Sequence, residues 1–122
     1  MQKKISIISS EFSNNQFYLT TNISIQALQP AGQILVDSDH FSFIYIMEDN
    51  EDYTYIILPE QLWPPLMRAY GQSNLIFVRF GNEEIELTSF HEELEFLITN
   101  IKGNSNYGEE MVTKVEQYFK EI

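Results

Sequence analysis

The sequence predicts one α+β domain over residues 1–122, with a largely antiparallel sheet of about six strands and two C-terminal amphipathic helices packed on one face of that sheet. Short runs of β-branched and aromatic residues alternate with turn residues before residue 88, and two helical patterns follow. An apolar content of 43% in 122 residues is enough for one buried core. Because the apolar stripe of each helix needs a covering layer, we expect both helices to lie on the sheet.

The N-terminal part of the chain predicts a β-hairpin. Residues 5–12 form its first strand and residues 17–20 its second, with turn-prone serine and asparagine at positions 13–15 between them. Residues 22–32 have a weaker pattern. They indicate a short helical turn, ended by Pro30, whose apolar residues are Ile23, Ile25 and Leu28.

Three further strands are predicted in the middle of the chain. They cover residues 33–37, 41–47 and 53–58, with turns at 37–40 and at the acidic stretch 48–52. A sheet with one solvated face would alternate apolar and polar residues. Here both faces are apolar, with Phe41, Phe43, Tyr45 and Met47 on one side of the fourth strand, Ile44 and Ile46 on the other, and a similar division of Tyr53, Tyr55 and Ile57 from Ile56 and Leu58.

A short helix and a second hairpin are predicted next. Residues 60–70 have a helical pattern, but two adjacent prolines starting at Pro64 cannot donate backbone hydrogen bonds, so we expect a turn before Pro64 and a helix beginning at it. Gly71 ends that helix. Residues 75–80 then form a strand that returns through a Gly-Asn turn as residues 83–87.

The clearest pattern belongs to the two C-terminal helices. Ser89 stands three residues before Glu92, the spacing of a capping box, so a helix is predicted to begin here. Its apolar stripe consists of Phe90, Leu94, Leu97, Ile98 and Ile101. Gly103 is placed to end it in a left-handed conformation. Asn106 is predicted to cap the second helix, which has its own stripe of Met111, Val112, Val115, Tyr118, Phe119 and Ile122.

Composition narrows the classes of partner. The net charge is −11, and no lysine or arginine occurs between Glu11 and Met67, so the clustered cations that nucleic acids require are not expected. The acidity is explained by solubility or by attraction to a basic protein partner. There is no cysteine, no signal-peptide pattern and no apolar run long enough to cross a membrane. We therefore expect a soluble, cytoplasmic protein without membrane partners.

Two groups of residues are candidates for a metal site or a small hydrolase. Asp37, Asp39 and His40 offer three ligands in one loop, although aspartate and serine are also ordinary turn residues. His91 and Glu95 lie one helical turn apart, as in zinc-hydrolase helices, but the second histidine of that motif is missing. No residue is assigned to a catalytic, cofactor or metal site on this basis.

Two stretches resemble a known family. They are GQILVDSDHFSFIYI, residues 32–46, and LTSFHEELEFLITNIKGNSNYGEEMV, residues 87–112. Both are similar to the YjbL-like family of small uncharacterised proteins from Gram-positive bacteria of the bacillus and staphylococcus type. The similarity covers nearly the whole chain, and His40 stands where that pattern has asparagine. The resemblance implies no activity, cofactor or catalytic residue.

The function expected from the sequence is a non-enzymatic protein–protein interaction or regulatory module, because catalytic constellations are missing while acidic and aromatic residues are abundant. The alternative is the metal-binding protein or small hydrolase described above, and a mimic of nucleic acid is a third hypothesis that requires a stripe of carboxylates. The apolar second face of strands 41–47 and 53–58 predicts a homodimer through that face or through Phe96. In the competing prediction, residues 22–32 cover the face and keep the protein monomeric.

Overall fold

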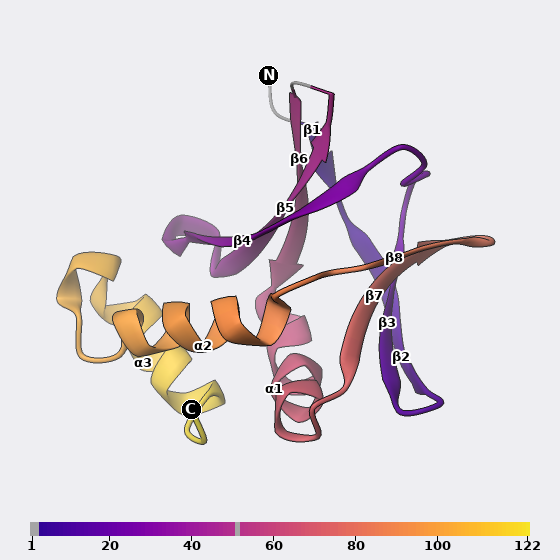
Figure 1. The fold of residues 1–122 in the computed structure, drawn as a ribbon. Helices are drawn as coiled ribbons and strands as arrows, with labels where there is room; N and C mark the ends of the chain where they lie inside the picture. Colours follow the sequence, from indigo (N-terminus) through magenta and orange to yellow (C-terminus); the bar gives the residue numbers. More distant parts are fainter. Residues whose placement is uncertain (1–2, 51) are drawn as a thin grey trace.

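The computed structural model describes residues 3–50 and 52–122. Within these ranges the chain forms eight strands and three α helices, and the strands make two four-stranded sheets, here called sheet A and sheet B (Figure 1). The α+β class is confirmed. The prediction of one sheet of about six strands is wrong, because eight strands form two sheets. Most of the strand pairs are antiparallel, as predicted, but each sheet also contains one parallel pair.

Sheet A has the order β1-β6-β5-β4, made of β1 (Lys3–Ile5), β6 (Asp52–Pro59), β5 (Ser42–Asp49) and β4 (Gln29–Asp37). β5 is antiparallel to both of its neighbours, whereas β1 is parallel to β6. β4 begins at Gln29, earlier than predicted, and its pairing shifts between Pro30 and Ile34. Pro30 is tolerated because β4 is an edge strand. The predicted acidic turn 48–52 joins β5 to β6, and Glu51 in it lies outside the described residues.

Sheet B has the order β2-β3-β7-β8, made of β2 (Ile7–Ser13), β3 (Gln16–Thr21), β7 (Leu75–Phe80) and β8 (Glu83–Glu86). Both predicted hairpins are confirmed. Asn14 and Asn15 have φ of 52° and 64°, the left-handed values that a two-residue turn between twisted strands requires. The parallel pairing of β3 with β7 joins the two hairpins side by side.

The predicted first strand is divided between the two sheets. Its beginning belongs to β1 in sheet A and its remainder to β2 in sheet B. Ser6 is the residue between the two strands, where the chain passes from one sheet to the other. The Ser6 carbonyl accepts a hydrogen bond of 3.0 Å from the Asn22 backbone N–H, and the Ser6 N–H donates to Asn22 Oδ1 at 3.1 Å. Ser6 is thereby held to the chain that leaves β3, and one extended segment connects the sheets.

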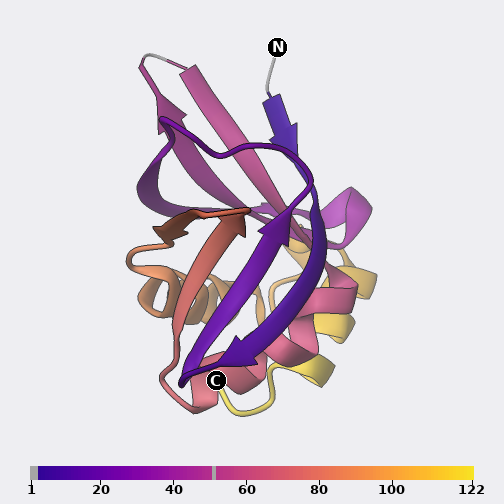
Figure 2. The same ribbon diagram turned by 90° about the vertical axis from the view of Figure 1, so that its right-hand side faces the viewer.

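The helices lie where the inner faces of both sheets converge. α1 (Trp63–Gly71) follows a short 3-10 turn, η2 (Glu60–Leu62), as the prolines predict. α2 (Phe90–Ile101) runs beneath β4 in Figure 1, with α3 (Glu109–Tyr118) beside it, and Figure 2 shows sheet B with the helices behind it. No helix among residues 3–50 and 52–122 is long and apolar enough to cross a membrane.

The core is aromatic where sheet A meets the helices. Phe43 of β5 stacks on Trp63 with ring centres 4.8 Å apart, and Phe119, at the end of α3, lies 5.8 Å from Phe43. Tyr45 of β5 stacks on Phe90 of α2 at 5.9 Å. α2 therefore packs on sheet A, whereas α3 packs mainly against α1 and α2, and the chain reaches the sheet after α3 through Phe119. The apolar stripes of both helices are the buried ones, as predicted.

Ser89 does precede the first residue of α2, as predicted, but its predicted capping box is wrong, and the predicted cap of α3 is also wrong because Gly108 precedes that helix. Ser89 has a left-handed backbone, φ 58° and ψ 18°, and its side chain makes no capping hydrogen bond, so the capping box with Glu92 does not form. Asn104, not Asn106, acts as a cap: its side chain accepts from the Asn106 N–H at 3.0 Å and begins a 3-10 turn, η3 (Ser105–Tyr107). Gly103 does end α2 with φ of 69°.

Candidate functional site

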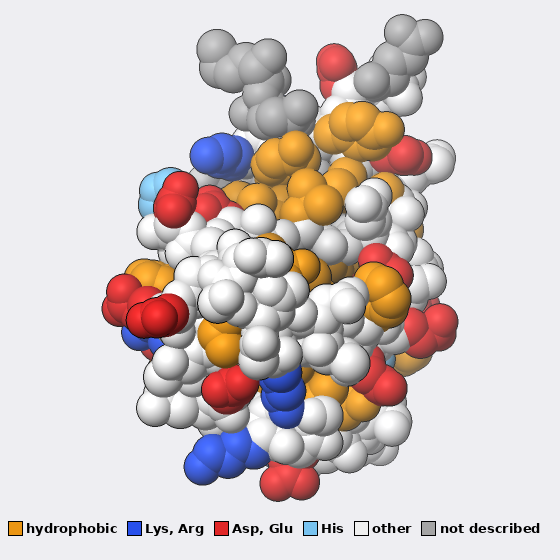
Figure 3. Space-filling model, turned by 90° about the vertical axis from the view of Figure 1, so that its left-hand side faces the viewer, with side chains coloured by type: hydrophobic (Ala, Val, Ile, Leu, Met, Phe, Trp, Pro, Cys, Tyr) orange, Lys and Arg blue, Asp and Glu red, His pale blue; other side chains and the backbone are white. Residues whose placement is uncertain are grey.

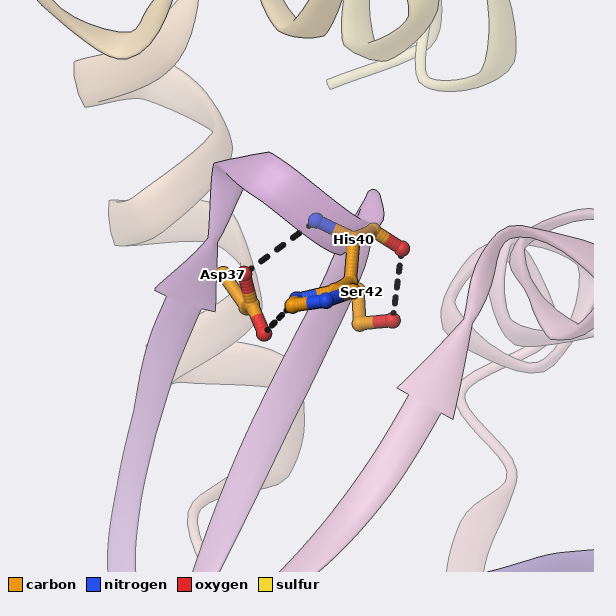
Figure 4. A network of polar contacts seen from close by, with 3 residues as sticks. All are labelled: Asp37, His40 and Ser42. Carbon is orange, nitrogen blue, oxygen red and sulfur yellow. Dashed lines mark hydrogen bonds and ion pairs between the residues drawn. The ribbon is translucent and has the colours of Figure 1, made fainter.

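The first group of candidate ligands forms a closed local turn. Ser38 to His40 make a 3-10 turn, η1 (Ser38–His40), after β4. Asp37 Oδ1 accepts from the His40 backbone N–H at 3.2 Å, Asp37 Oδ2 accepts from His40 Nδ1 at 2.9 Å, and Ser42 Oγ donates to the His40 carbonyl at 3.0 Å (Figure 4). The Asp37 carboxylate thus caps the turn, as the alternative to a metal site predicted.

Asp39 of the same turn lies apart from this network. It lines an open hollow of about 430 Å³ together with Phe41, Tyr107 and the first turn of α3, where Glu109 and Glu110 lie. Phe41 has a left-handed backbone with φ of 47°, and the Lys114 ammonium lies 4.9 Å from its ring centre. Asp39 therefore faces a wide, acidic hollow, whereas the Asp37 carboxylate is bonded to His40 within the turn.

The second group joins three elements. His91 Nε2 donates to the Asn74 carbonyl at 2.6 Å and so connects α2 to the residue before β7. Glu95, one turn later, accepts from the Tyr70 hydroxyl of α1 at 2.5 Å, and this hydrogen bond raises the pKa of Tyr70 above 10.0. The rings of Tyr70 and His91 meet edge to face at 5.6 Å. The contacts give His91 and Glu95 a role in packing.

The fold does not bring the two groups together. The 37–40 turn lies beside α3, whereas His91 and Glu95 face α1 and the start of β7. Within the described parts of the chain, no three His, Asp or Glu side chains are arranged to hold a metal ion. These residues therefore supply no shared site for the chemistry that the alternative hypothesis requires.

An apolar surface does exist on sheet A, on the side away from the helices; we call it the outer face. The strand register places Ile44, Ile46, Tyr53, Tyr55, Ile57 and Leu35 on it. Tyr53 is 50% exposed, while Ile44 and Ile46 keep 8% and 7% because neighbouring side chains surround them. Hydrophobic side chains gather in the upper part of the surface in Figure 3. Phe43 and Tyr45, by contrast, point into the core.

Residues 22–32 do not cover the outer face. Ile25 is fully buried in the main core, and Ile23 and Leu28 pack against that core. The Ile25 backbone N–H and the Ser24 hydroxyl both donate to the Glu83 carboxylate of β8 at 2.9 Å. This segment is therefore tied to sheet B, and the prediction that it shields the second face of the middle strands is wrong.

Two charged residues at the margin of the outer face escaped sequence reasoning. Lys4 of β1 is in register with Tyr55, and Glu48 of β5 is in register with Tyr53. Both side chains are exposed. Glu48 is placed by the β5–β6 hairpin, whereas Lys4 is placed by the parallel pairing of β1 with β6. The local sequence holds no signal for that parallel pair, because strand partners distant in the chain are chosen by the tertiary fold.

A second surface surrounds Phe96 on α2. This side chain is 68% exposed, as its outward position in the helical pattern predicts. It lines an open hollow of about 340 Å³ with Glu92, Glu95 and Thr99. We call these four residues the Phe96 surface. It combines one large apolar ring with two carboxylates.

Comparison with known proteins gives a family and no activity. A family model described as a family of unknown function, UPF0738, matches residues 5–119. A UPF0738 protein of Bacillus licheniformis is 45% identical over 120 residues, and the UPF0738 protein YjbL of Bacillus subtilis is 44% identical over 121; each alignment covers 98% of this chain and 99% of the relative. No solved structure matches. The chain therefore belongs to the UPF0738 family, and its resemblance to YjbL is confirmed.

Proposed function

We propose that the protein is a non-enzymatic interaction or regulatory module that binds a basic protein partner through the Phe96 surface. The supporting observation is the exposure of Phe96, at 68%, on a helix whose other large apolar side chains are buried or packed against the core. The ring contributes nothing to the core. Exposed aromatic side chains of this kind are enriched where proteins meet their partners.

The charged residues around Phe96 indicate which kind of side chain a partner would place there. α2 contains Glu92, Glu93 and Glu95, and its sequence from Phe90 to Ile101 has no lysine or arginine. Glu92 and Glu95 border the same hollow as the Phe96 ring. An arginine or lysine can lie over an aromatic face and pair with a neighbouring carboxylate at the same time. The surface therefore fits a cationic side chain.

Other aromatic rings of the chain already carry such a cation. Arg68 lies 4.1 Å from the centre of the Phe12 ring, Arg79 lies 4.7 Å from that of Tyr18, and Lys114 lies 4.9 Å from that of Phe41. Among the described residues no cation of the chain lies over Phe96. The chain makes this kind of contact internally at three rings, and the exposed Phe96 ring is open to the same contact with another molecule.

The test is an NMR titration of isotope-labelled protein with a short peptide rich in arginine and lysine. We expect amide shifts centred on α2, and we expect Phe96→Ala to weaken binding about fivefold, the value of one exposed cation–π contact. Ile8→Ala is the matched control, because Ile8 is 67% exposed on β2, far from α2 in the sequence. A peptide with glutamine in place of each cation should not bind.

Affinity capture from native lysate then tests whether a natural partner uses the same surface. Wild type and Ile8→Ala should retain the same protein, while Phe96→Ala and the double variant Glu92→Gln with Glu95→Gln should lose most of it. Equal retention by all variants, or reproducible absence of any partner, contradicts the proposal. The metal-binding or hydrolase alternative would use Asp37, Asp39, His40, His91 and Glu95. None of the hydrogen bonds that these residues make favours that alternative.

A further inference from the structure

We infer that the outer face of sheet A is the interface of a symmetric dimer, in which Lys4 of each copy pairs with Glu48 of the other. The face is a continuous block of apolar side chains on three adjacent strands, β6, β5 and β4. Neither the helices nor residues 22–32 contact it as a covering layer. A second copy of the chain fits this face, because the face carries two opposite charges that can pair with those of an identical copy.

The complement lies in the placement of the two charges. Tyr55 of β6 has Lys4 beside it on β1, and Tyr53, one step nearer the hairpin end, has Glu48 beside it on β5. Lys4 and Glu48 thus lie on opposite sides of β6. With strands about 4.8 Å apart and about 3.4 Å per residue along a strand, their Cα atoms are roughly 12 Å apart. Neither forms an ion pair within the described chain.

A twofold axis can use this arrangement. If the axis lies in the plane between two facing sheets and passes between Tyr53 and Tyr55, rotation places Lys4 opposite Glu48 of the partner subunit and Glu48 opposite Lys4 of the partner subunit. The same axis runs over Ile46 and Ile44 toward Leu35, so these apolar side chains meet their own copies. A twofold interface has this property of being complementary to itself.

The energetics agree with a second copy as occupant. Packing the two faces together removes the exposed Tyr53 and the partly exposed Tyr55, Ile57 and Leu35 from water. Burial of this apolar surface favours the dimer. Each chain carries a net charge of −11, but repulsion between charges beyond about 8 Å is screened at physiological salt. At contact distance the interface contains two opposite-charge pairs, which fix the register of the copies.

Analytical ultracentrifugation with charge-reversed variants tests this interface. Wild type should change from 14.3 kDa, the mass of one chain, to twice that value between micromolar and millimolar concentration. Lys4→Glu alone and Glu48→Lys alone should each raise the dissociation constant at least about tenfold, because each homodimer then contains two like-charge pairs. An equimolar mixture of the two variants should dimerise again, because the mixed dimer regains both opposite-charge pairs.

Lys120→Glu and Glu121→Lys are the matched controls, since they make the same charge changes at two exposed positions after α3. Alone or mixed, they should leave the dissociation constant within about twofold of wild type. Circular dichroism establishes that Lys4→Glu is folded, and Lys4→Gln replaces it if it is not. A wild-type mass of one chain at every concentration overturns the inference. A mixture that stays as weak as the single variants overturns the Lys4–Glu48 pairing.

Discussion

The two faces of sheet A come from the same strands and have similar apolar composition, yet they differ in what covers them. On the inner face, Phe43 and Tyr45 meet Trp63, Phe119 and Phe90 across ring distances of 4.8 to 5.9 Å. On the outer face, the six apolar residues named above have no helix against them. The parity of an apolar residue along the strand therefore decides whether it packs in the core or lies on the uncovered face. If the inferred dimer forms, residues of the uncovered face contribute to association, and substitutions on either side measure that difference.

The largest effect is expected from Phe43→Ala. Phe43 is fully buried between two aromatic rings, so truncation loses its transfer free energy and leaves a cavity. We expect the free energy of unfolding to fall by about 3–5 kcal/mol. Urea denaturation followed by fluorescence of Trp63 measures it. A loss below about 1 kcal/mol would show that the inner face is not the closely packed one.

A smaller effect is expected from Tyr45→Phe, which keeps the ring and removes one hydrogen bond. The Tyr45 hydroxyl donates to the Thr88 carbonyl at 2.6 Å and so joins β5 to the residue before the α2 N-terminus. Its removal should lower the free energy of unfolding by about 1 kcal/mol. The same urea experiment measures the loss. Tyr55→Phe on the outer face should leave stability unchanged, because the Tyr55 hydroxyl makes no hydrogen bond with the residues that the structure describes.

Alkaline pH should reduce the advantage of Tyr45 over phenylalanine. Burial raises the pKa of Tyr45 above 10.0, its value in the unfolded chain, so the folded state holds the phenolic proton more tightly. The stability difference is then fully present below pH 10.0 and is lost as the pH rises through the folded-state pKa. Unfolding curves of wild type and Tyr45→Phe between neutral and strongly alkaline pH should converge. Parallel curves would contradict this assignment.

The smallest effect on stability is expected on the outer face, from Tyr53→Thr. Tyr53 is 50% exposed, and threonine keeps the strand preference, so the free energy of unfolding should change by less than about 0.5 kcal/mol. Thermal unfolding at sub-micromolar concentration, where association does not contribute, measures it. The same variant should weaken the dimer. If the variant lost stability but kept its dimer, Tyr53 would contribute to the folded chain and not to the dimer interface, which is the opposite of what we expect for the outer face.

The sequence by itself determined the elements whose signals are local. The stripe from Phe90 to Ile101 specifies α2, because residues three and four apart share one helix face wherever the helix lies. The asparagines at 14 and 15 specify a hairpin, since the backbone conformation of a tight turn depends on its own residues. Of the candidate site, the sequence supplied Phe96 and the apolar character of both faces of the middle strands.

The tertiary structure decided everything that depends on strands meeting across the chain. The division of the first strand at Ser6 and the parallel pairs β1 with β6 and β3 with β7 have no local signature, because such pairing is selected by contacts between distant segments. The Ser89 capping box fails because the chain enters α2 through a left-handed residue while Tyr45 holds the preceding carbonyl. Lys4 and Glu48 likewise flank one surface only because β6 lies between their strands, and a one-residue change of register would separate them.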